Sequence, residues 1–490
     1  MTYSEFKFKP AVSLALLVLA GSCFGAMAKP SKGQAMIDIR AHGAIEGGTN
    51  LCTESINRAV AVCAEQGGGK VIVPSGAWLT GTIVLKSHVE LHLQSGATLL
   101  ASTNHDDFPT FNPTYRSHKD INGFHALIYA ESEKHIAITG SGTIDGQGKL
   151  QRPRKGRQFV SDRDGRSRNI LLISCSDIRV EGITMRNSAV WNQHYLNCEN
   201  VLVDRVTVFN HANRNNDGID IDGCRDFVLS NSTIDSDDDG ICLKSTGPAP
   251  CERVLVTNCV VSSHCNAIKT GTESTGGFKD IKITNCRVKP SSSTDKVVFG
   301  RREGITGITV GCVDGGICEN IDIGNITIEG TLVPIYVRLG KRNRAHTAGA
   351  KVTKDGSMRN VVIHDVTASG CGDWGCAILG LPGNPIQGIA FRDITITFPG
   401  GGTDKDAART IKEHLAGYPQ PTLWGKLPAY GFFVRNADDV TLQNINLQTV
   451  KPDQRSPLWL ENVKGLTLSK LTTPPLADGK DGVMRKNVVE

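Results

Sequence analysis

One nine-residue phrase recurs along the chain: residues 177–185 read DIRVEGITM, residues 200–208 read NVLVDRVTV, and residues 226–234 read DFVLSNSTI. Each copy starts with a polar or small residue and alternates apolar positions around a central polar pair. This pattern is typical of a short strand, a kink and a second short strand. Further copies begin at Arg253, Asp280, Asn320, Asn360, Gly388, Asp439 and Gly465.

The basic spacing between copies is 23 to 28 residues, with longer intervals where insertions occur. This period is too short for a propeller blade, lacks the leucine-rich signature and shows no helical pattern. It predicts an all-β fold, a single-stranded right-handed parallel β-helix in which each strand pairs with its equivalent one rung away. We expect one domain over residues 29–490, because every rung needs its neighbours.

Composition agrees with a folded solenoid and limits the partners. The 490 residues are 39% hydrophobic and 21% charged and include 53 glycines, which argues against a disordered chain or a coiled coil. The 54 basic and 49 acidic residues give a net charge of only +5. This balance argues against a nucleic-acid partner, so any polyanionic ligand must be bound locally.

Residues 1–28 are typical of a secretion signal. Lys7 and Lys9 precede an apolar run over residues 11–20, and small residues end the segment at Ala26-Met27-Ala28. The run is too short for a membrane span, and a lipoprotein signal at Cys23 is the weaker alternative. We therefore expect a secreted or periplasmic protein with no membrane span.

Residues 53–64 are expected to form a helix that covers the open N-terminal end of the β-helix. Thr53 can serve as N-cap, and Ile56, Val60 and Cys63 share one helical face. An uncovered terminal rung would otherwise offer unpaired backbone groups to another chain.

Long insertions interrupt the rungs at about 150–169, 338–359 and 400–427. Loops of this length on a rigid scaffold usually build a binding surface. We expect an exposed helix over residues 405–415 within the third. The first is strongly basic between Lys149 and Arg168, so it either holds sugar carboxylates or is a solvated loop.

Fourteen cysteines remain once Cys23 is removed with the signal. An oxidising compartment permits disulfides but does not require them. Cys175, Cys198 and Cys224 occupy one position in the repeat, so we expect them to stack as small buried residues. The sequence has no CxxC pair, which makes a zinc site unexpected.

Carboxylates concentrate in two adjacent rungs, Asn215-Asn216-Asp217-Gly218 and Asp237-Asp238-Asp239-Gly240. Asp217 and Asp238 are 21 residues apart, close to one rung, so Asp217 should lie beside Asp238 and Asp239. Stacked like charges destabilise a fold and raise the pKa of at least one carboxyl. Glycoside hydrolysis uses this arrangement, because one acid protonates the leaving oxygen and a carboxylate activates water.

Two other interpretations of the three aspartates remain, a calcium site and solvated turn residues. For Asp220, Asp222 and Asp235 we expect the solvated-turn interpretation, since aspartate is common in bends.

The pattern Asn215-x-Asp217-Gly218 followed by Asp238-Asp239 resembles glycoside hydrolase family 28, the polygalacturonase family, and the repeats extend the resemblance over nearly all of the mature chain. The resemblance implies an inverting hydrolase of galacturonate-containing pectic polysaccharide or oligogalacturonide, with no cofactor and no metal. It implies Asp238 as general acid, with Asp217 and Asp239 holding the nucleophilic water, and Asn215 as a substrate-binding residue.

Two motifs of that family are altered. Asn266 stands at the expected histidine position, with His264 two residues away and Lys269 on the same rung. The family's Arg-Ile-Lys is represented by Arg338-Leu339-Gly340-Lys341, which shifts the lysine by one residue. We retain all five side chains as candidate substrate-binding residues. Family members that cut the mixed rhamnose–galacturonate backbone also depart at the histidine.

Trp191 and His194, one rung before Asp217, complete the candidate substrate-binding set. Trp191 either packs in the core or stacks on a sugar. The insertions favour a pocket and exo action over an open groove, and we expect a monomer. Two alternatives remain, a calcium-dependent eliminase like pectate lyase and a non-catalytic carbohydrate-binding β-helix.

Overall fold

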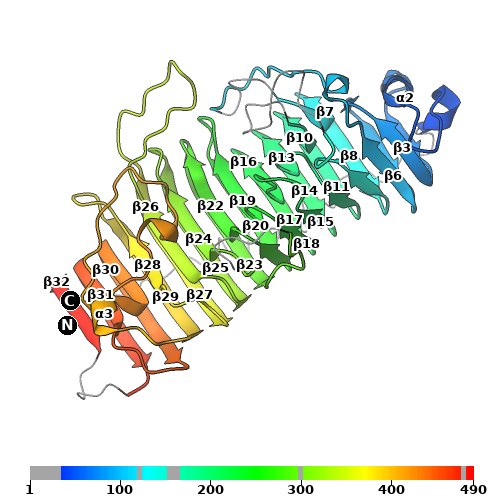
Figure 1. Ribbon diagram of the computed structural model, residues 1–490. Coiled ribbons are helices and arrows are strands. Elements are labelled where there is room, and N and C mark those ends of the chain that lie inside the picture. Colours follow the sequence, from blue (N-terminus) through cyan, green and yellow to red (C-terminus); the bar gives the residue numbers. More distant parts are fainter. Residues whose placement is uncertain (1–34, 119–123, 152–165, 296–301, 476–481) are drawn as a thin grey trace.

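The structure is a computed structural model, and it describes residues 35–118, 124–151, 166–295, 302–475 and 482–490. Its strands stack side by side into one elongated solenoid (Figure 1), and every strand pairing between named elements is parallel. The predicted parallel β-helix is therefore confirmed. The predicted signal, residues 1–28, lies outside the described residues.

Three columns of strands run along the solenoid. The first comprises β1 (Ala35–Asp38), β2 (Gly69–Val73), β5 (Val89–Leu93), β8 (Lys134–Gly140), β11 (Ser176–Glu181), β14 (Glu199–Asp204), β17 (Arg225–Ser230) and β20 (Cys251–Thr257). The second comprises β3 (Gly76–Thr80), β6 (Ala97–Ala101), β9 (Thr143–Asp145), β12 (Thr184–Arg186), β15 (Thr207–Asn210), β18 (Thr233–Ser236) and β21 (Val260–Ser263).

Towards the C-terminus these two columns merge into long strands that turn the corner without a break. They are β23 (Gly277–Val288), β25 (Ile317–Glu329), β27 (Ser357–Ser369), β29 (Ile386–Phe398), β30 (Ala429–Thr449) and β31 (Ser456–Thr472), followed by β32 (Val483–Val489). The third column comprises β4 (Ile83–Val84), β7 (Ala126–Glu131), β10 (Arg168–Ile173), β13 (Gln193–Leu196), β16 (Ile219–Asp222), β19 (Ile241–Ser245), β22 (Asn266–Ser274), β24 (Thr306–Cys312), β26 (Val333–Leu339) and β28 (Cys376–Leu379). It continues into the first parts of β30 and β31.

The repeated phrase keeps the predicted register. Ile178 pairs with Val201, and Val201 pairs with Phe227, each the second residue of its copy. The first residue of every copy has a positive φ, for example 54° at Asn200. Asn, Asp and Gly tolerate this left-handed conformation best, which explains why most copies begin with one of them. Arg253 is the exception, and Asp226 holds its guanidinium at 2.7 Å.

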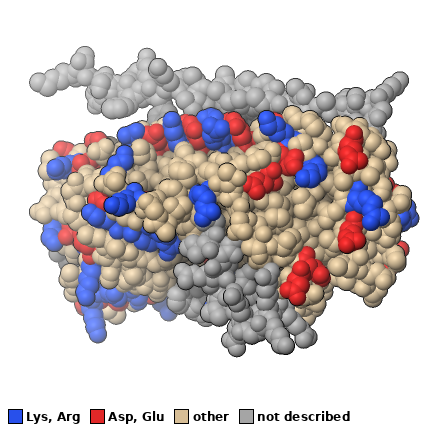
Figure 2. Space-filling model, turned by 90° about the horizontal axis from the view of Figure 1, so that it is seen from above, with Lys and Arg blue, Asp and Glu red and all other residues tan. Residues whose placement is uncertain are grey.

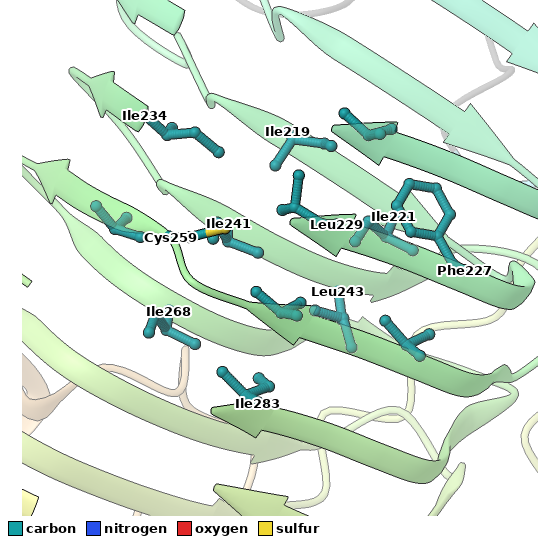
Figure 3. Packing of buried hydrophobic residues seen from close by; sticks show 14 of the residues in the cluster. Ile219, Ile221, Phe227, Leu229, Ile234, Ile241, Leu243, Cys259, Ile268 and Ile283 are labelled. Atoms are coloured by element: carbon teal, nitrogen blue, oxygen red, sulfur yellow. The ribbon is translucent and has the colours of Figure 1, made fainter. Parts of the chain in front are cut away.

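Inward-facing apolar residues of successive strands fill the interior (Figure 3). Ile219 pairs with Ile241, and Ile241 with Ile268, and all three are buried. Cys175, Cys198 and Cys224 are buried and free, as predicted for small fillers. Charged side chains lie outside this core, and Figure 2 shows basic and acidic residues interspersed over one face.

The predicted N-terminal cap is present as α2 (Thr53–Glu65), whose buried face includes Ile56, Val60 and Cys63. It lies at the N-terminal end of the solenoid (Figure 1), beside a short 3₁₀ helix, η2 (Ile39–His42). The predicted N-cap is wrong, because Cys52 precedes the helix and Thr53 is its first residue. The Thr53 hydroxyl instead accepts a hydrogen bond from the Gly81 backbone N–H at 2.7 Å. None of the described helices is long and apolar enough to span a membrane.

Two of the predicted insertions are described in full, whereas residues 152–165 of the first lie outside the described residues. The second begins only after β26, so Arg338 belongs to a strand. The predicted helix over 405–415 is wrong, because α3 (Asp404–Ala407) has only four residues. Beyond it the backbone forms tertiary contacts, for example Ile411 O, which accepts from Arg435 at 2.8 Å. Two short 3₁₀ helices, η3 (His105–Asp107) and η5 (Pro421–Leu423), complete the elements.

Candidate active site

The candidate site lies on the outer face of the third column, at the turns that lead into β16 and β19. Gly218 N donates to Asp239 O at 2.9 Å, so Asp217 and Asp239 occupy matching positions in adjacent rungs, as the spacing predicted. Because side chains alternate along a strand, the inward Ile219 and Ile221 leave Asp220 and Asp222 facing outward. In register with Asp220 and Asp222, β19 presents Cys242 and Lys244.

Asp239 is held as a carboxylate. Asn266 Nδ2 donates to its Oδ1 at 2.6 Å, and Lys269 Nζ lies 2.8 Å from its Oδ2. Burial disfavours the charge, but the ammonium groups of Lys269 and Lys244 outweigh burial and lower the pKa of Asp239. Lys269 and Asn266, predicted to bind substrate, therefore both contact Asp239.

Asp238 differs from its neighbour, since it is partly exposed whereas Asp217 and Asp239 are buried. The Asn215 amide donates to Asp238 Oδ2 at 3.4 Å. Low solvation and, next, the adjacent Asp239 raise the pKa of Asp238. Of the three predicted catalytic carboxyls, Asp238 is thus the one that reaches the surface, and its pKa is raised whereas that of Asp239 is lowered.

The ammonium group of Lys244 lies among the carboxyl groups of Asp217, Asp220 and Glu273. Its Nζ lies 3.4 Å from Asp217 Oδ2, 3.3 Å from Asp220 Oδ1 and 3.7 Å from Glu273 Oε2. Burial, followed by Asp220, raises the pKa of Asp217, and burial raises the pKa of Asp220 to about 7. The predicted solvated role of Asp220 is wrong, because it is fully buried.

Asp222 and Asp235 are also buried, so the solvated-turn prediction is wrong for them too. Asp222 Oδ2 lies 2.9 Å from His194 Nε2, and Thr246 N donates to Asp222 Oδ1 at 2.8 Å. His194, predicted to bind substrate, has no exposed surface, and burial lowers its pKa to about 4. Trp191 is buried as well, with Lys244 Nζ 4.5 Å from its ring centroid. His194 and Trp191 are therefore buried against Asp222 and Lys244.

The family model described as glycosyl hydrolases family 28 matches residues 63–416. The chain belongs to glycosyl hydrolase family 28. The chain is thus an O-glycosyl hydrolase, and the resemblance noted from the aspartate motifs is confirmed.

Named relatives agree with this assignment. The chain is 27% identical over 452 residues to a probable polygalacturonase of Vitis vinifera, covering 86% of this chain and 88% of the relative. It is 24% identical to an exo-poly-alpha-D-galacturonosidase of Dickeya chrysanthemi, covering 68% of this chain and 63% of that enzyme. The solved exopolygalacturonase of Thermotoga maritima matches with a TM-score of 0.67 and 20% identity, covering 90% of this chain and 96% of that chain. This structural likeness supports the fold.

In this family 28 hydrolase, the ring of His264 contacts Asp237 and Ser293. Its ring nitrogens lie 3.2 Å from Asp237 Oδ1 and 3.2 Å from Ser293 O, and the side chain is fully buried. His264 therefore does not take the place of the family histidine, whose position Asn266 occupies beside Asp239.

Arg338 and Lys341 do not join the carboxylates either. Arg338 is buried and donates to Glu413 O at 3.2 Å and to His414 O at 3.1 Å. Lys341 Nζ pairs with Asp355 at 3.0 Å on the surface. Arg338 anchors the 400–427 insertion, because its Nη2 donates to two backbone carbonyls of that segment.

Several residues at the site were not predicted from sequence. The 400–427 insertion brings the Tyr418 ring centroid within 5.8 Å of Lys269 Nζ and places Gln420 Nε2 3.4 Å from Cys265 Sγ. Across the site, His118 Nε2 lies 3.6 Å from Glu273 Oε1. These contacts join residues 149 to 155 positions apart, for example 155 between Cys265 and Gln420. No local pattern signals such pairings.

From the basic insertion, Arg166 Nη2 donates to Asn215 Oδ1 at 3.0 Å. Arg166 itself is buried, and Asn215 in turn reaches Asp238. Arg166, in the described part of this insertion, thus positions the site residue Asn215.

Proposed function

We propose that this protein hydrolyses α-linked galacturonate chains of pectic polysaccharide with inversion at the anomeric carbon. The names of the Vitis vinifera and Dickeya chrysanthemi relatives support the substrate class. One observation carries the proposal: two adjacent carboxyls have opposite environments. Both oxygens of Asp239 accept from cationic or amide donors, whereas Asp238 is partly exposed with a raised pKa.

In the proposed reaction, Asp238 donates its proton to the glycosidic oxygen as the bond to the anomeric carbon breaks. Asp239 and Asp217 hold the water that attacks the opposite face of the sugar and accept its proton. Asp217 Oδ1 has no hydrogen-bond partner among the described residues, which leaves an acceptor for that water. Lys244 compensates the charge that gathers on Asp217.

We further propose that cleavage starts from chain ends. Tyr418 and Gln420 approach the site from one insertion, and His118 approaches from the segment before β7. Segments on two sides of the carboxylates favour a closed pocket over an open groove.

The first experiment compares polygalacturonate with rhamnogalacturonan as substrate and measures new reducing ends, absorbance of unsaturated sugars and the size of the products. We expect reducing ends from polygalacturonate, no unsaturated product, and monomers or dimers from the first time point. An unsaturated, ultraviolet-absorbing product would show an eliminase. Binding without cleavage would show a carbohydrate-binding protein.

A second specificity, for the mixed rhamnose–galacturonate backbone, is favoured by Asn266, which stands beside Asp239 where the family has histidine. Reducing ends from rhamnogalacturonan alone would establish this alternative.

We also propose export through cleavage of residues 1–28 and a monomeric state. N-terminal sequencing of exported protein should begin at Lys29, and light scattering should give the mass of one chain.

A further inference from the structure

Three side chains outside the proposed active site occupy one position in consecutive rungs. Asn210 pairs with Ser236, and Ser236 pairs with Ser263, so the residues that follow them, His211, Asp237 and His264, stack on one another. One ring nitrogen of each histidine and one oxygen of Asp237 all lie within 4.8 Å of one another. The two rings are 4.9 Å apart between centroids.

His211 presents an unused electron pair. Its Nε2 lies 2.8 Å from Asp235 Oδ1. Ser291 Oγ donates to the same oxygen at 2.6 Å, and Ser292 N and Oγ donate to Asp235 Oδ2 at 2.9 Å and 2.7 Å. Asp235 thus accepts hydrogen bonds at both oxygens, so Nε2 of His211 carries the ring proton and Nδ1 has a lone pair. Nδ1 has no hydrogen-bond partner among the described residues, and the side chain is 2% exposed.

Both ring nitrogens of His264 face hydrogen-bond acceptors. Its Nε2 lies 3.2 Å from Ser293 O and its Nδ1 lies 3.2 Å from Asp237 Oδ1, and both partners are acceptors. A neutral imidazole carries one proton, so it can donate to only one of them. When Nε2 donates to the carbonyl, the Nδ1 lone pair faces a carboxylate oxygen. A cation between these two atoms removes the repulsion.

We propose that His211, Asp237 and His264 bind a divalent transition-metal ion, with Zn²⁺ as the first candidate. Imidazole nitrogen with carboxylate oxygen suits Zn²⁺, whereas Ca²⁺ takes oxygen ligands. Bond lengths of about 2.0–2.2 Å in a tetrahedral zinc site place ligand atoms roughly 3.2–3.6 Å apart. The distance of 3.2 Å between His264 Nδ1 and Asp237 Oδ1 agrees with this separation.

The outer partners fit the same assignment. Metal-bound histidines usually donate the second ring N–H to a carboxylate or a backbone carbonyl. Here the Nε2–H of His211 faces Asp235 Oδ1, and the Nε2–H of His264 faces the backbone oxygen of Ser293. The ion would link three successive turns, including the one where Asp237 immediately precedes Asp238, so it would stabilise the turn that carries the proposed acid. Binding of this ion does not depend on the substrate that the protein cleaves.

The test uses tag-free mature protein, stripped with chelator and dialysed against Zn²⁺, with bound metal measured by mass spectrometry and Tm by calorimetry. We expect about one Zn²⁺ per chain and a higher Tm. His211→Gln and His264→Gln should each lower the affinity at least tenfold. His364→Gln, which changes a half-buried histidine paired with Asp322 and Asp365, should leave the affinity unchanged.

Asp237→Asn provides a second variant of similar shape in case either histidine variant fails to fold, and circular dichroism checks folding of all of them. Co²⁺ bound at this site should give absorption bands in the visible spectrum that are typical of nitrogen and oxygen ligands. Absence of Zn²⁺ binding, unchanged affinity in the folded variants, or a thiolate charge-transfer band that places Co²⁺ on cysteine would each overturn the proposal.

Discussion

Lys269 Nζ lies 2.8 Å from Asp239 Oδ2, and both side chains are almost completely buried. A buried ion pair of this kind is costly to form, and removing one partner leaves an uncompensated charge. The pair therefore fixes the protonation state of Asp239 more than it adds to the stability of the fold. It gives the site one permanent carboxylate beside Asp238.

Replacing Lys269 should move the pH dependence of catalysis. In Lys269→Met the pKa of Asp239 rises, so the acidic limb of kcat/KM against pH should shift to higher pH and activity near pH 5 should fall about 100-fold. Lys269→Arg should restore much of the wild-type profile. Lys282→Met, which breaks the pair of Lys282 on β23 with Asp322 on β25, is the matched control and should leave the profile unchanged. An unshifted limb in Lys269→Met would refute this role.

Asp238→Asn should remove the proton donor while preserving size and the contact with Asn215. We expect kcat to fall by about 10³-fold or more with little change in substrate binding, since general acid catalysis contributes on that order. Asp226→Asn, on the outer surface of β17, should keep full activity. Reducing-end assays and titration calorimetry measure the two quantities. Full turnover in Asp238→Asn would exclude it as the acid.

The sequence predicts the register of this fold well because the cause is local. The phrase beginning at Asp177 recurs with a residue that tolerates positive φ at its start, and each copy fixes one rung. The juxtaposition of Asp217 with Asp238 and Asp239 followed from the same register. The alternation of side chains along β16 also predicts that Asp220 lies on the outer face of the strand, since the apolar Ile219 and Ile221 on either side of it face the core.

The remaining site residues depend on distant segments. Arg338 was expected in the cleft, yet it binds the backbone at Glu413 and His414, 75 and 76 residues away. The path of an insertion is set by such tertiary contacts, and no period or turn motif encodes it. The same reason explains why Tyr418 near Lys269 could not be anticipated.

Arg338→Met should loosen the 400–427 insertion. Loss of two hydrogen bonds from a buried guanidinium leaves carbonyls unpaired and should destabilise the protein by about 2–3 kcal/mol. Limited proteolysis should cut this insertion faster than in wild type, with cleavage sites identified by mass spectrometry. Lys341→Met removes only the exposed pair with Asp355 and should behave as wild type. Equal proteolysis rates in the two variants would contradict the anchoring role.

Cys265 should be the first thiol to react in the native protein, because the other cysteines within the described residues are buried. Burial, followed by Asp238, raises the pKa of Cys265, so alkylation should be slow at pH 7 and accelerate at higher pH. A bulky adduct beside Gln420 and Asn266 should block the site. Peptide mapping should find one labelled cysteine, and Cys265→Ser should resist inactivation. Labelling of several cysteines before activity falls would contradict this prediction.

The buried pair of His194 and Asp222 should make stability depend on pH. The pKa of His194 is lowered to about 4 by burial, against about 6.5 in the unfolded chain, so the unfolded state binds the additional proton between these values. The free energy of unfolding should therefore fall as the pH drops from about 6.5 to about 4, by up to about 3 kcal/mol from this group. Urea denaturation at several pH values measures it, and His194→Gln should flatten the slope. His364→Gln is the control of opposite sign, because Asp322 raises the pKa of His364 and its contribution is lost as pH rises. A slope in His194→Gln as steep as that of wild type would assign the acid sensitivity to other groups.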